Sequence, residues 1–449
     1  MKIHILGICG TFMGGVAAIA RELGHEVSGS DKGVYPPMSE TLQALGITLM
    51  EGYQPEHIQP HPDLVIIGNA LSRGNVAVEY VLNNQIPYIS GPQWLAETVL
   101  HQRHVLAVAG THGKTTTSSM LAWILEFAGL NPGYLIGGVA QNFETTARLG
   151  SNYFVIEADE YDTAFFDKRS KFIHYRPRTL IMNNLEFDHA DIFTNLDAIK
   201  LQFQYLLRGV PGDGLVIRNA VDTNLSDVVH RGCWSRQQSF GDVMSWHARE
   251  MSADCREFDV YFANDYKGHV SWPMLGQHNL KNALAAIAAA TDVGVIAKQA
   301  CEALSNFKGI RRRLEIRGEV NGVTVYDDFA HHPTAIRETV SALRQAIGQQ
   351  RVIVVLQFGS NTMKLGEHAQ QIAPSLKQAD EVILLNPENF DTSKICDEIG
   401  THAQHFDTVD QIVTQLTQIA KPQDHILIMS NKGFGGIHSK VLDMLRLRN

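Results

Sequence analysis

The feature that most constrains the fold is a glycine-rich turn made of Gly110, Thr111, His112, Gly113, Lys114, Thr115 and Thr116. An apolar run at 104–109 precedes this turn, and a helical pattern follows it at 118–128. A strand, such a turn and a helix form an anion site, because backbone N–H groups and the helix N-terminus point at phosphate. Lys114 can neutralise the β- and γ-phosphates, and the Thr115 hydroxyl can hold Mg²⁺. The segment predicts a nucleoside triphosphate site in an α/β domain.

The spacing of this turn departs from the standard phosphate loop. Val108 stands where the first glycine of that loop is expected, and Gly110 lies only three residues before Gly113. A tight turn with an exposed lysine is the alternative interpretation. The flanking strand and helix patterns favour the phosphate site over that alternative.

Length and composition limit the protein class. A chain of 449 residues is too long to fold around a single hydrophobic core, so its length suggests about three domains. Its 44% hydrophobic and 19% charged residues are typical of a globular protein, and no apolar run reaches the length of a membrane helix. The first seven residues predict a strand and no signal peptide, and five scattered cysteines predict a reducing cytoplasm. A net charge of −9 argues against nucleic acid or an anionic membrane as the main partner.

The first hundred residues alternate strand and helix patterns. Strands are expected at 3–6, 26–30 and 64–67, with a helix at 16–23. Asp31 follows the second strand, where an acid takes ribose hydroxyls in mononucleotide-binding folds. The dinucleotide fingerprint is broken, because Cys9 occupies its second glycine position. The pattern favours a nucleotide other than NAD, and a helix-start turn that binds nothing is the alternative.

A second domain begins near Arg103 and carries acidic groups at its strand ends. Buried strands at 152–156 and 179–182 lead into Glu157 and His189. Because parallel sheets collect ligands at the carboxyl ends of their strands, these side chains should converge on the phosphate loop. Glu157 with Thr115 is predicted to hold Mg²⁺, and His189 to hold a second metal or orient a substrate carboxylate. The alternatives are a surface acid and a capping histidine. Supporting roles are left open for Asp159, Glu160 and Asp188.

A third unit is expected to contain strands at 323–326, 352–356, 381–385 and 425–429, with helices between them. Before it lies a long helix at 276–291, whose first turn contains His278 and Asn279. Together with Gln277, these two residues either contact adenine or ribose, or Asn279 simply caps the helix.

Two further polar segments flank the third unit's first strand. The arginines at 311–313 either form a solvated charge run or reach a transferring phosphoryl group on domain closure. The segment at 327–333 is a polar loop whose chemistry stays undecided. The fold class is therefore α/β, with three α/β domains in series.

With these motifs in hand, the chain resembles the Mur ligase family over essentially its whole length. Six motifs in order carry the resemblance: G-T-H-G-K-T-T at 110–116, E-A-D-E at 157–160, D-H-A-D at 188–191, G-Q-H-N-L-K-N at 276–282, R-R-L-E at 312–315 and D-D-F-A-H-H-P at 327–333. The turn G-I-C-G-T-F-M-G-G at 7–15 resembles the UDP-binding turn of members that use UDP-N-acetylmuramate.

The resemblance implies a Rossmann-like UDP-N-acetylmuramate-binding domain at 1–102, a central P-loop ATPase-type domain at 103–311 and a Rossmann-like amino-acid- or peptide-binding domain at 312–449. It implies ATP and Mg²⁺ at two metal sites, with Thr115 and Glu157 holding the first ion and His189 the second. It also assigns His278 and Asn279 to adenosine, Arg313 to phosphate and Asp328 to ribose. The implied UDP-site residues are Gly10, Gly14, Asp31 and Asn69.

Within the family, the stretches at 29–39, 68–75 and 360–366 resemble the branch that joins UDP-N-acetylmuramate to the murein tripeptide L-alanyl-γ-D-glutamyl-meso-diaminopimelate during peptidoglycan recycling. This implies ATP-dependent amide formation through an acyl phosphate. That branch usually carries Glu-Pro-Arg where Gln357, Phe358 and Gly359 stand here.

Three alternatives remain at this point. One is the ligase of peptidoglycan biosynthesis that joins UDP-N-acetylmuramate to L-alanine. Another is a folate or amino-acid-polymerising ligase, which lacks a UDP-binding first domain. The third belongs to a different class and is a nucleotide-dependent switch or binding protein without ligase activity. The sequence indicates no oligomeric state.

Overall fold

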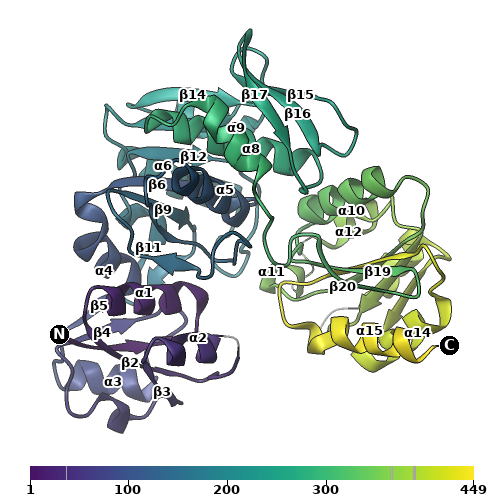
Figure 1. Ribbon diagram of the computed structural model, residues 1–449. Coiled ribbons are helices and arrows are strands. Elements are labelled where there is room, and N and C mark those ends of the chain that lie inside the picture. Colours follow the sequence, from purple (N-terminus) through teal and green to yellow (C-terminus); the bar gives the residue numbers. More distant parts are fainter. Residues whose placement is uncertain (37, 365, 367, 388–390, 449) are drawn as a thin grey trace.

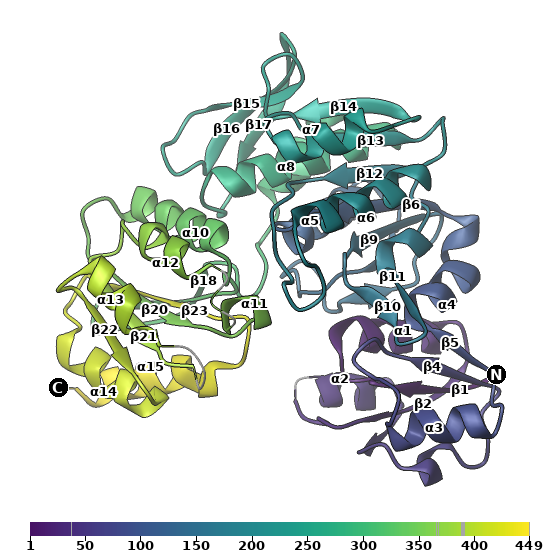
Figure 2. The ribbon, with the colours of Figure 1, turned by 180° about the vertical axis from the view of Figure 1, so that it is seen from behind.

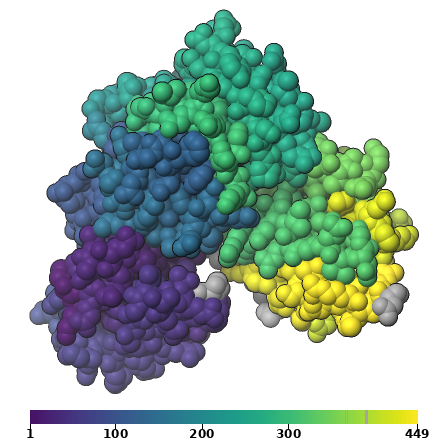
Figure 3. Space-filling model, in the orientation of Figure 1, coloured from purple at the N-terminus to yellow at the C-terminus, as the bar shows by residue number. Residues whose placement is uncertain are grey.

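The computed structural model describes residues 1–36, 38–364, 366, 368–387 and 391–448. Pro37 and Leu365, which belong to two of the stretches compared above, lie outside the described residues. The chain forms three α/β units in series, each built around its own main sheet (Figure 1). Figure 3 shows the N-terminal and C-terminal units on different sides of the central unit. No helix among the described residues is long and apolar enough to cross a bilayer.

The N-terminal unit is a five-stranded parallel sheet in the order β3-β2-β1-β4-β5. Its strands are β1 (Lys2–Leu6), β2 (Glu26–Asp31), β3 (Thr48–Glu51), β4 (Leu64–Ile67) and β5 (Tyr88–Ser90). Its helices are α1 (Thr11–Glu22), α2 (Met38–Ala44), η1 (Pro55–Ile58), α3 (Val76–Asn83), α4 (Gly91–Thr98) and η2 (Leu100–Gln102). The strand order reverses between β1 and β4, so a crevice for ligands is expected where these two strands end.

A buried histidine makes this unit sensitive to acid. His4 in β1 is 1% exposed, and its ring nitrogens lie 2.9 Å from the hydroxyls of Ser28 and Ser30. Burial, followed by the nearby His57, lowers the pKa of His4 from 6.5 to about 4. The folded state therefore favours neutral His4, so its contribution to stability is complete above pH 6.5 and is lost as the pH falls toward 4.

This pKa shift gives a measurable pH dependence. We expect His4 to account for a loss of about 2 kcal/mol in the free energy of unfolding between pH 7 and pH 5. Urea unfolding of His4→Gln should therefore show a pH dependence smaller than that of the wild type by this amount. His101→Gln, at an exposed site, is the control. Equal pH dependence in wild type and His4→Gln would contradict the assignment.

The central unit has a ten-stranded sheet in the order β17-β16-β15-β14-β13-β12-β6-β9-β7-β8. Its strands are β6 (His104–Ala109), β7 (Gly133–Leu135), β8 (Ala147–Arg148), β9 (Tyr153–Ala158), β12 (Thr179–Met182), β13 (Leu215–Asn219), β14 (Arg236–Phe240), β15 (Trp246–Glu250), β16 (Glu257–Phe262) and β17 (Asp265–Ser271). Strands β9, β6, β12 and β13 are parallel neighbours, so their carboxyl ends meet at one edge.

The helices of this unit are α5 (Lys114–Phe127), α6 (Leu196–Arg208), α7 (Thr223–His230), α8 (Gln277–Asp292) and α9 (Ala297–Ser305). Helices α5 and α8 pack together with the sheet in one hydrophobic cluster. Alanine occupies most of the buried positions of α8, which allows close approach of the two helices. The sequence patterns predicted this helix and the central parallel strands.

A small hairpin of the central unit packs against the N-terminal unit. The sequence patterns did not predict this hairpin. It consists of β10 (Asp162–Ala164) and β11 (Asp167–Ser170), and η3 (Lys171–His174) follows it directly. Phe165 at its tip packs on a core cluster of the N-terminal unit, and the ring of Phe166 lies 5.1 Å from that of Tyr88. Figure 2 shows β10 and β11 beside α1 and β5.

The C-terminal unit is a six-stranded sheet in the order β18-β19-β23-β20-β21-β22, in which only β18 is antiparallel. Its strands are β18 (Glu315–Val320), β19 (Val323–Asp328), β20 (Val352–Gln357), β21 (Glu381–Leu385), β22 (Ala403–Phe406) and β23 (His425–Met429). Its helices are α10 (Pro333–Ile347), α11 (Asn361–Lys364), α12 (Ala369–Ser375), α13 (Ser393–Ile399), α14 (Val409–Ile419), η4 (Phe434–Gly436) and α15 (Ile437–Leu447).

Candidate active site

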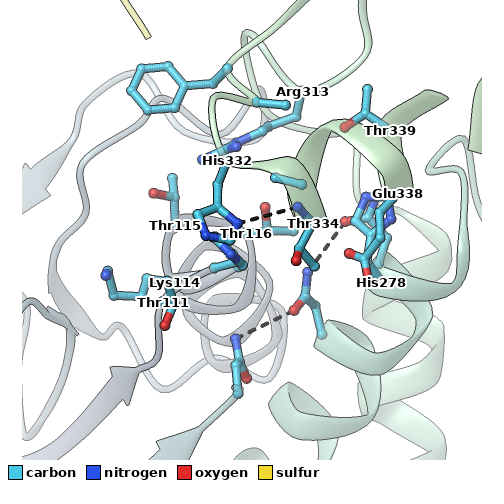
Figure 4. A pocket seen from close by; sticks show the side chains of 18 of the residues that line it. Thr111, Lys114, Thr115, Thr116, His278, Arg313, His332, Thr334, Glu338 and Thr339 are labelled. Carbon is cyan, nitrogen blue, oxygen red and sulfur yellow. Dashed lines mark hydrogen bonds between the residues drawn. The ribbon is translucent and has the colours of Figure 1, made fainter. Parts of the chain in front are cut away.

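A cavity of about 1100 Å³ lies where the three units meet. Residues of the phosphate loop and the central strand ends form one wall, and residues of the C-terminal unit form the opposite wall. Thr11 and Phe12, in the first turn of α1, reach the same cavity from the N-terminal unit. Figure 4 shows Arg313 and His332 lying over the loop that carries Lys114 and Thr115.

The glycines of the phosphate loop are required by conformation and by space. Gly110 has a φ of +140° and Gly113 a φ of +79°, a region that disfavours side chains. A Cβ on Gly113 would lie 2.6 Å from the Asn282 amide oxygen. The backbone thus passes close to α8 before α5 begins at Lys114, and the first N–H groups of α5 are positioned for an anion.

Lys114 is held by acidic groups at the end of β9. Its ammonium donates to the Gly110 carbonyl and to Glu160 Oε2, both at 2.8 Å, and lies 3.6 Å from Asp159 Oδ1. Burial alone would lower the pKa of Lys114, but Glu160 and Asp159 outweigh burial and raise it above its ordinary value. Lys114 therefore carries a positive charge across the physiological pH range.

Glu160 also pairs with His189, which links the two predicted catalytic groups. Its Oε1 lies 3.0 Å from His189 Nε2. Burial opposes ionisation of Glu160, yet Lys114 and His189 together lower its pKa to about 2. Burial lowers the pKa of His189, but Glu160 and Asp188 reverse this effect and leave it raised. A lysine, a glutamate and a histidine thus form one buried charge network.

The oxygen groups of the loop fit a hard divalent cation. Glu157 in β9 accepts the Gly137 N–H at 2.6 Å and a hydrogen bond from the Thr115 hydroxyl, and burial raises its pKa. A carboxylate beside a hydroxyl is a donor set suited to Mg²⁺. A second set consists of Asp159, Glu160 and His189, whose ligand atoms lie within 4.8 Å of one another.

In the wall formed by the C-terminal unit, the positively charged Arg313 lies near Asp328, a carboxylate that backbone hydrogen bonds hold in place. Asp328 accepts the N–H groups of Leu314 and Ala330, both at 2.8 Å, which fixes it at the end of β19. The Arg313 guanidinium lies over the Phe329 ring at 5.1 Å. Burial, followed by the charge of Arg313, lowers the pKa of His278 across the cavity to about 4.

Polar contacts between the central and C-terminal units close this side of the cavity. The Thr334 hydroxyl donates to Glu186 Oε2 at 2.8 Å, and the rings of His112 and His332 lie 4.5 Å apart. Thr362, from the stretch at 360–366, donates to Asp188 at 3.0 Å. The structure therefore presents the two units in contact around the phosphate loop.

Sequence and structure comparisons agree on one family. Three family models match: the "Mur ligase family, catalytic domain" at 2–103, the "Mur ligase middle domain" at 108–290 and the "Mur ligase, glutamate ligase domain" at 312–432. The UDP-N-acetylmuramate–L-alanyl-γ-D-glutamyl-meso-2,6-diaminoheptandioate ligase of Escherichia coli strain K12 is 56% identical, over 99% of this chain and 98% of its own length. The chain belongs to the Mur ligase family.

Two further relatives of this Mur ligase are informative. A crystal structure of a murein peptide ligase from Psychrobacter arcticus 273-4 is 46% identical, with a TM-score of 0.78 and 99% of each chain covered. The UDP-N-acetylmuramate–L-alanine ligase of Syntrophomonas wolfei is 33% identical, over 99% of this chain and 97% of its own length. The expected family and its three-unit α/β fold are therefore confirmed.

The structure brings most of the predicted site residues of this Mur ligase to one cavity. The lining includes Thr111, His112, Gly113, Lys114, Thr115, Thr116, Glu157, His189, His278, Asn279, Arg313 and Asp328. Gly110 lies just behind them, with its carbonyl on Lys114. Asn279 is 5% exposed and donates to the Leu275 carbonyl at 2.8 Å, whereas Gly276 is the N-cap residue of α8.

The predicted UDP-site residues lie outside this lining. Gly10 is the N-cap residue of α1, and Asn69 follows β4, so both flank the carboxyl end of β1 as expected for a crevice there. Each Asp31 carboxylate oxygen accepts one backbone N–H, from Cys9 at 2.9 Å and from Gly33 at 3.1 Å. Asp31 therefore braces the turn, and its contact with ribose stays a prediction. On Gly14, a Cβ would approach Met38 Sδ to 2.7 Å.

Sequence reasoning gave too little weight to Glu160 and missed Lys171 and Thr334. The sequence leaves the role of Glu160 open, and the structure shows that Glu160 is the carboxylate shared by Lys114 and His189. Its position two residues beyond the end of β9 was a usable signal, since strand ends face the loop. Lys171 belongs to no motif that the patterns singled out, and Thr334 stands directly after the motif at 327–333. The contacts of both residues with the cavity become visible only in the packing of the units.

Within the departure at 357–359, the structure leaves no space for a side chain at Gly359. Gln357 Oε1 accepts the Ser430 hydroxyl at 2.5 Å, and Phe358 is 3% exposed. A Cβ on Gly359 would lie 2.1 Å from Asn431 Oδ1, a buried atom without a hydrogen-bond partner among the described residues. Asn431 lines the cavity, so the packing of Gly359 fixes part of its wall.

We therefore expect Gly359→Ala to displace Asn431 and raise the KM for the acceptor substrate by about tenfold, a cost of the size of one lost hydrogen bond. The matched control is Gly433→Ala, where a Cβ meets nothing within 4 Å. Steady-state kinetics with varied acceptor test this expectation. An unchanged acceptor KM in Gly359→Ala would show that Asn431 does not shape the acceptor site.

Proposed function

We propose that this Mur ligase joins the carboxylate of UDP-N-acetylmuramate to the amino group of L-alanyl-γ-D-glutamyl-meso-diaminopimelate, with ATP as co-substrate, in peptidoglycan recycling. One observation carries the proposal. The Lys114–Glu160–His189 network lies at a helix N-terminus, in a cavity to which all three units contribute residues. An ATP-driven condensation of two further substrates requires such a meeting point.

The choice of acceptor rests on the relatives. Among the relatives reported above, two have names that include the tripeptide or murein peptide, and these are 56% and 46% identical to this chain. The L-alanine ligase reported above is 33% identical. Full-length similarity at these values supports the tripeptide over free L-alanine as acceptor.

The proposed reaction has two steps. The carboxylate oxygen attacks the γ-phosphorus of ATP, the bond to ADP breaks and an acyl phosphate forms. The tripeptide amine then attacks the acyl carbon and loses a proton, the bond between the acyl carbon and the phosphate oxygen breaks, and inorganic phosphate leaves. The first step brings a carboxylate against the negatively charged triphosphate, so the fixed charge of Lys114 and the N–H groups of α5 stabilise the charge on the transferring phosphoryl.

We propose the C-terminal unit's arginine as a second positive group for the same phosphoryl. Arg313 faces the loop across the cavity, and Asp328 with His278 and Asn279 is proposed to meet the adenosine. Mg²⁺ on Thr115 and Glu157, and a second ion with His189, would screen the phosphate charges. A histidine that binds a metal ion must be unprotonated at the ligating nitrogen. Binding of a cation at His189 would therefore release its proton.

We propose that residues 1–102 bind UDP-N-acetylmuramate through Gly10, Gly14, Asp31 and Asn69. Residues 103–311 would bind ATP, and residues 312–449 the peptide. The cavity lining supports this division, because each unit contributes to one side of it. Thr11 and Phe12 belong to the proposed UDP turn at 7–15 and also line the cavity, so a sugar bound at this turn can extend toward Lys114.

The test measures ADP release with ATP, Mg²⁺ and UDP-N-acetylmuramate, comparing the tripeptide with L-alanine as acceptor. We expect turnover with the tripeptide well above that with L-alanine. A preference for L-alanine would assign the chain to peptidoglycan biosynthesis. ATP hydrolysis that is independent of either acceptor would instead support a nucleotide-dependent switch and contradict ligation.

A further inference from the structure

A buried lysine faces the cavity at the junction of the N-terminal and central units. Lys171, the first residue of η3, has a side chain that is 9% exposed and lines the cavity. Its ammonium lies 5.4 Å from the centre of the Phe12 ring and 5.7 Å from that of Tyr161.

The charge of Lys171 is only partly compensated. Its Nζ lies 3.6 Å from Asp159 Oδ2 and makes no hydrogen bond to any of the described residues. The other oxygen of Asp159 lies 3.6 Å from Lys114, so one carboxylate serves two ammonium groups. Burying an ammonium without hydrogen bonds is costly, which favours an anion that enters the cavity and takes its donors.

The backbone fixes where this ammonium stands. The Lys171 N–H donates to the Tyr161 carbonyl at 2.8 Å, and the preceding Ser170 hydroxyl donates to the Glu160 carbonyl at 2.6 Å. The hairpin that leads into Lys171 is anchored on the N-terminal unit by the Phe166–Tyr88 contact. Lys171 is therefore positioned between the first turn of α1 and the phosphate loop.

We propose that Lys171 binds the carboxylate of the UDP-sugar acid and directs it toward the γ-phosphate held by Lys114. This inference rests on the proposed function, in which a sugar bound by the N-terminal unit must present its carboxylate at the phosphate loop. Asp159 separates the two ammonium groups, so an acid on Lys171 lies next to the phosphoryl site without occupying it. Lys171 then selects the acidic sugar over a neutral one.

The test compares two ligands that differ in this acid. UDP-N-acetylmuramate carries the carboxylate, and UDP-N-acetylglucosamine lacks it. Calorimetry should show that Lys171→Met weakens binding of UDP-N-acetylmuramate at least about tenfold, the effect of losing one charged hydrogen bond, and leaves UDP-N-acetylglucosamine unchanged. The matched control is Lys168→Met on the same hairpin, where the side chain is 71% exposed. It should leave both affinities unchanged.

Binding of UDP-N-acetylglucosamine also reports whether each variant is folded, and Lys171→Gln provides a second variant that keeps a polar side chain. If the affinities for both UDP-sugars fall equally, Lys171 binds the diphosphate and the proposal is overturned. The proposal is also overturned if Lys171→Met and Lys171→Gln still bind UDP-N-acetylmuramate more tightly than UDP-N-acetylglucosamine by the wild-type ratio. In those cases tripeptide-dependent turnover of the wild type would still support the proposed function. A wild type that binds neither UDP-sugar would refute both.

Discussion

Replacing Lys114 with methionine is expected to lower turnover about 1000-fold, the effect of removing a preorganised charge from a transition state. The Lys114 ammonium is fixed by Glu160 and the Gly110 carbonyl at 2.8 Å each, so it needs no rearrangement to meet a phosphate. Its raised pKa keeps the charge present at neutral pH. ADP release at saturating ATP and both substrates measures this effect.

The folded state of Lys114→Met must be checked, because the substitution leaves Glu160 paired with His189 alone. Thermal unfolding gives this check, and Lys168→Met, an exposed lysine, gives the kinetic control. Turnover within about tenfold of wild type in folded Lys114→Met would remove this lysine from phosphoryl transfer, since such a residual effect is far below that of a lost charge.

Glu160 and His189 are expected to act as a unit. His189→Ala and Glu160→Gln should each lower turnover about 100-fold, because each disrupts the charge network at the reacting phosphoryl. The Glu160–His189 contact of 3.0 Å predicts that their effects are not additive. We expect the double variant to be about as slow as the slower single variant.

A double-mutant cycle on kcat tests this coupling. Fully additive losses, about 10,000-fold in the double variant, would show that the two side chains act independently. Magnesium titrations of each variant add a second measurement. If His189 and Glu160 share a cation, both variants should need more Mg²⁺ for half-maximal turnover, whereas Gly433→Ala should need the same amount as wild type.

Local patterns in the sequence predicted the central strands of the N-terminal and C-terminal sheets and the strands around the phosphate loop, but not the edge strands β3, β5 and β22. The apolar runs that became β6, β9, β12, β20 and β23 are short, continuous and bounded by polar residues, as in strands buried on both faces. The helix patterns after them are equally regular. The predicted starts of α1 and α5 were wrong by several residues. The sequence patterns placed them at 16 and 118, whereas the helices begin at Thr11 and Lys114.

The hairpin of β10 and β11 shows where such patterns stop being informative. Its strands are three and four residues long and carry mostly polar side chains, so neither alternation nor propensity distinguishes them from a loop. They form because Phe165 and Phe166 find partners on the N-terminal unit, which are contacts between segments distant in sequence.

The sequence by itself determined the phosphate loop, the strands that lead into Glu157 and His189, and the family, because these depend on short motifs and on their order along the chain. Only the tertiary structure decided that Glu160 joins Lys114 to His189 and that Lys171 faces the same cavity. The physical reason is that electrostatic pairing depends on distances of a few ångströms between side chains. Those distances are fixed by how the sheets and units pack, and spacing along the chain does not contain them.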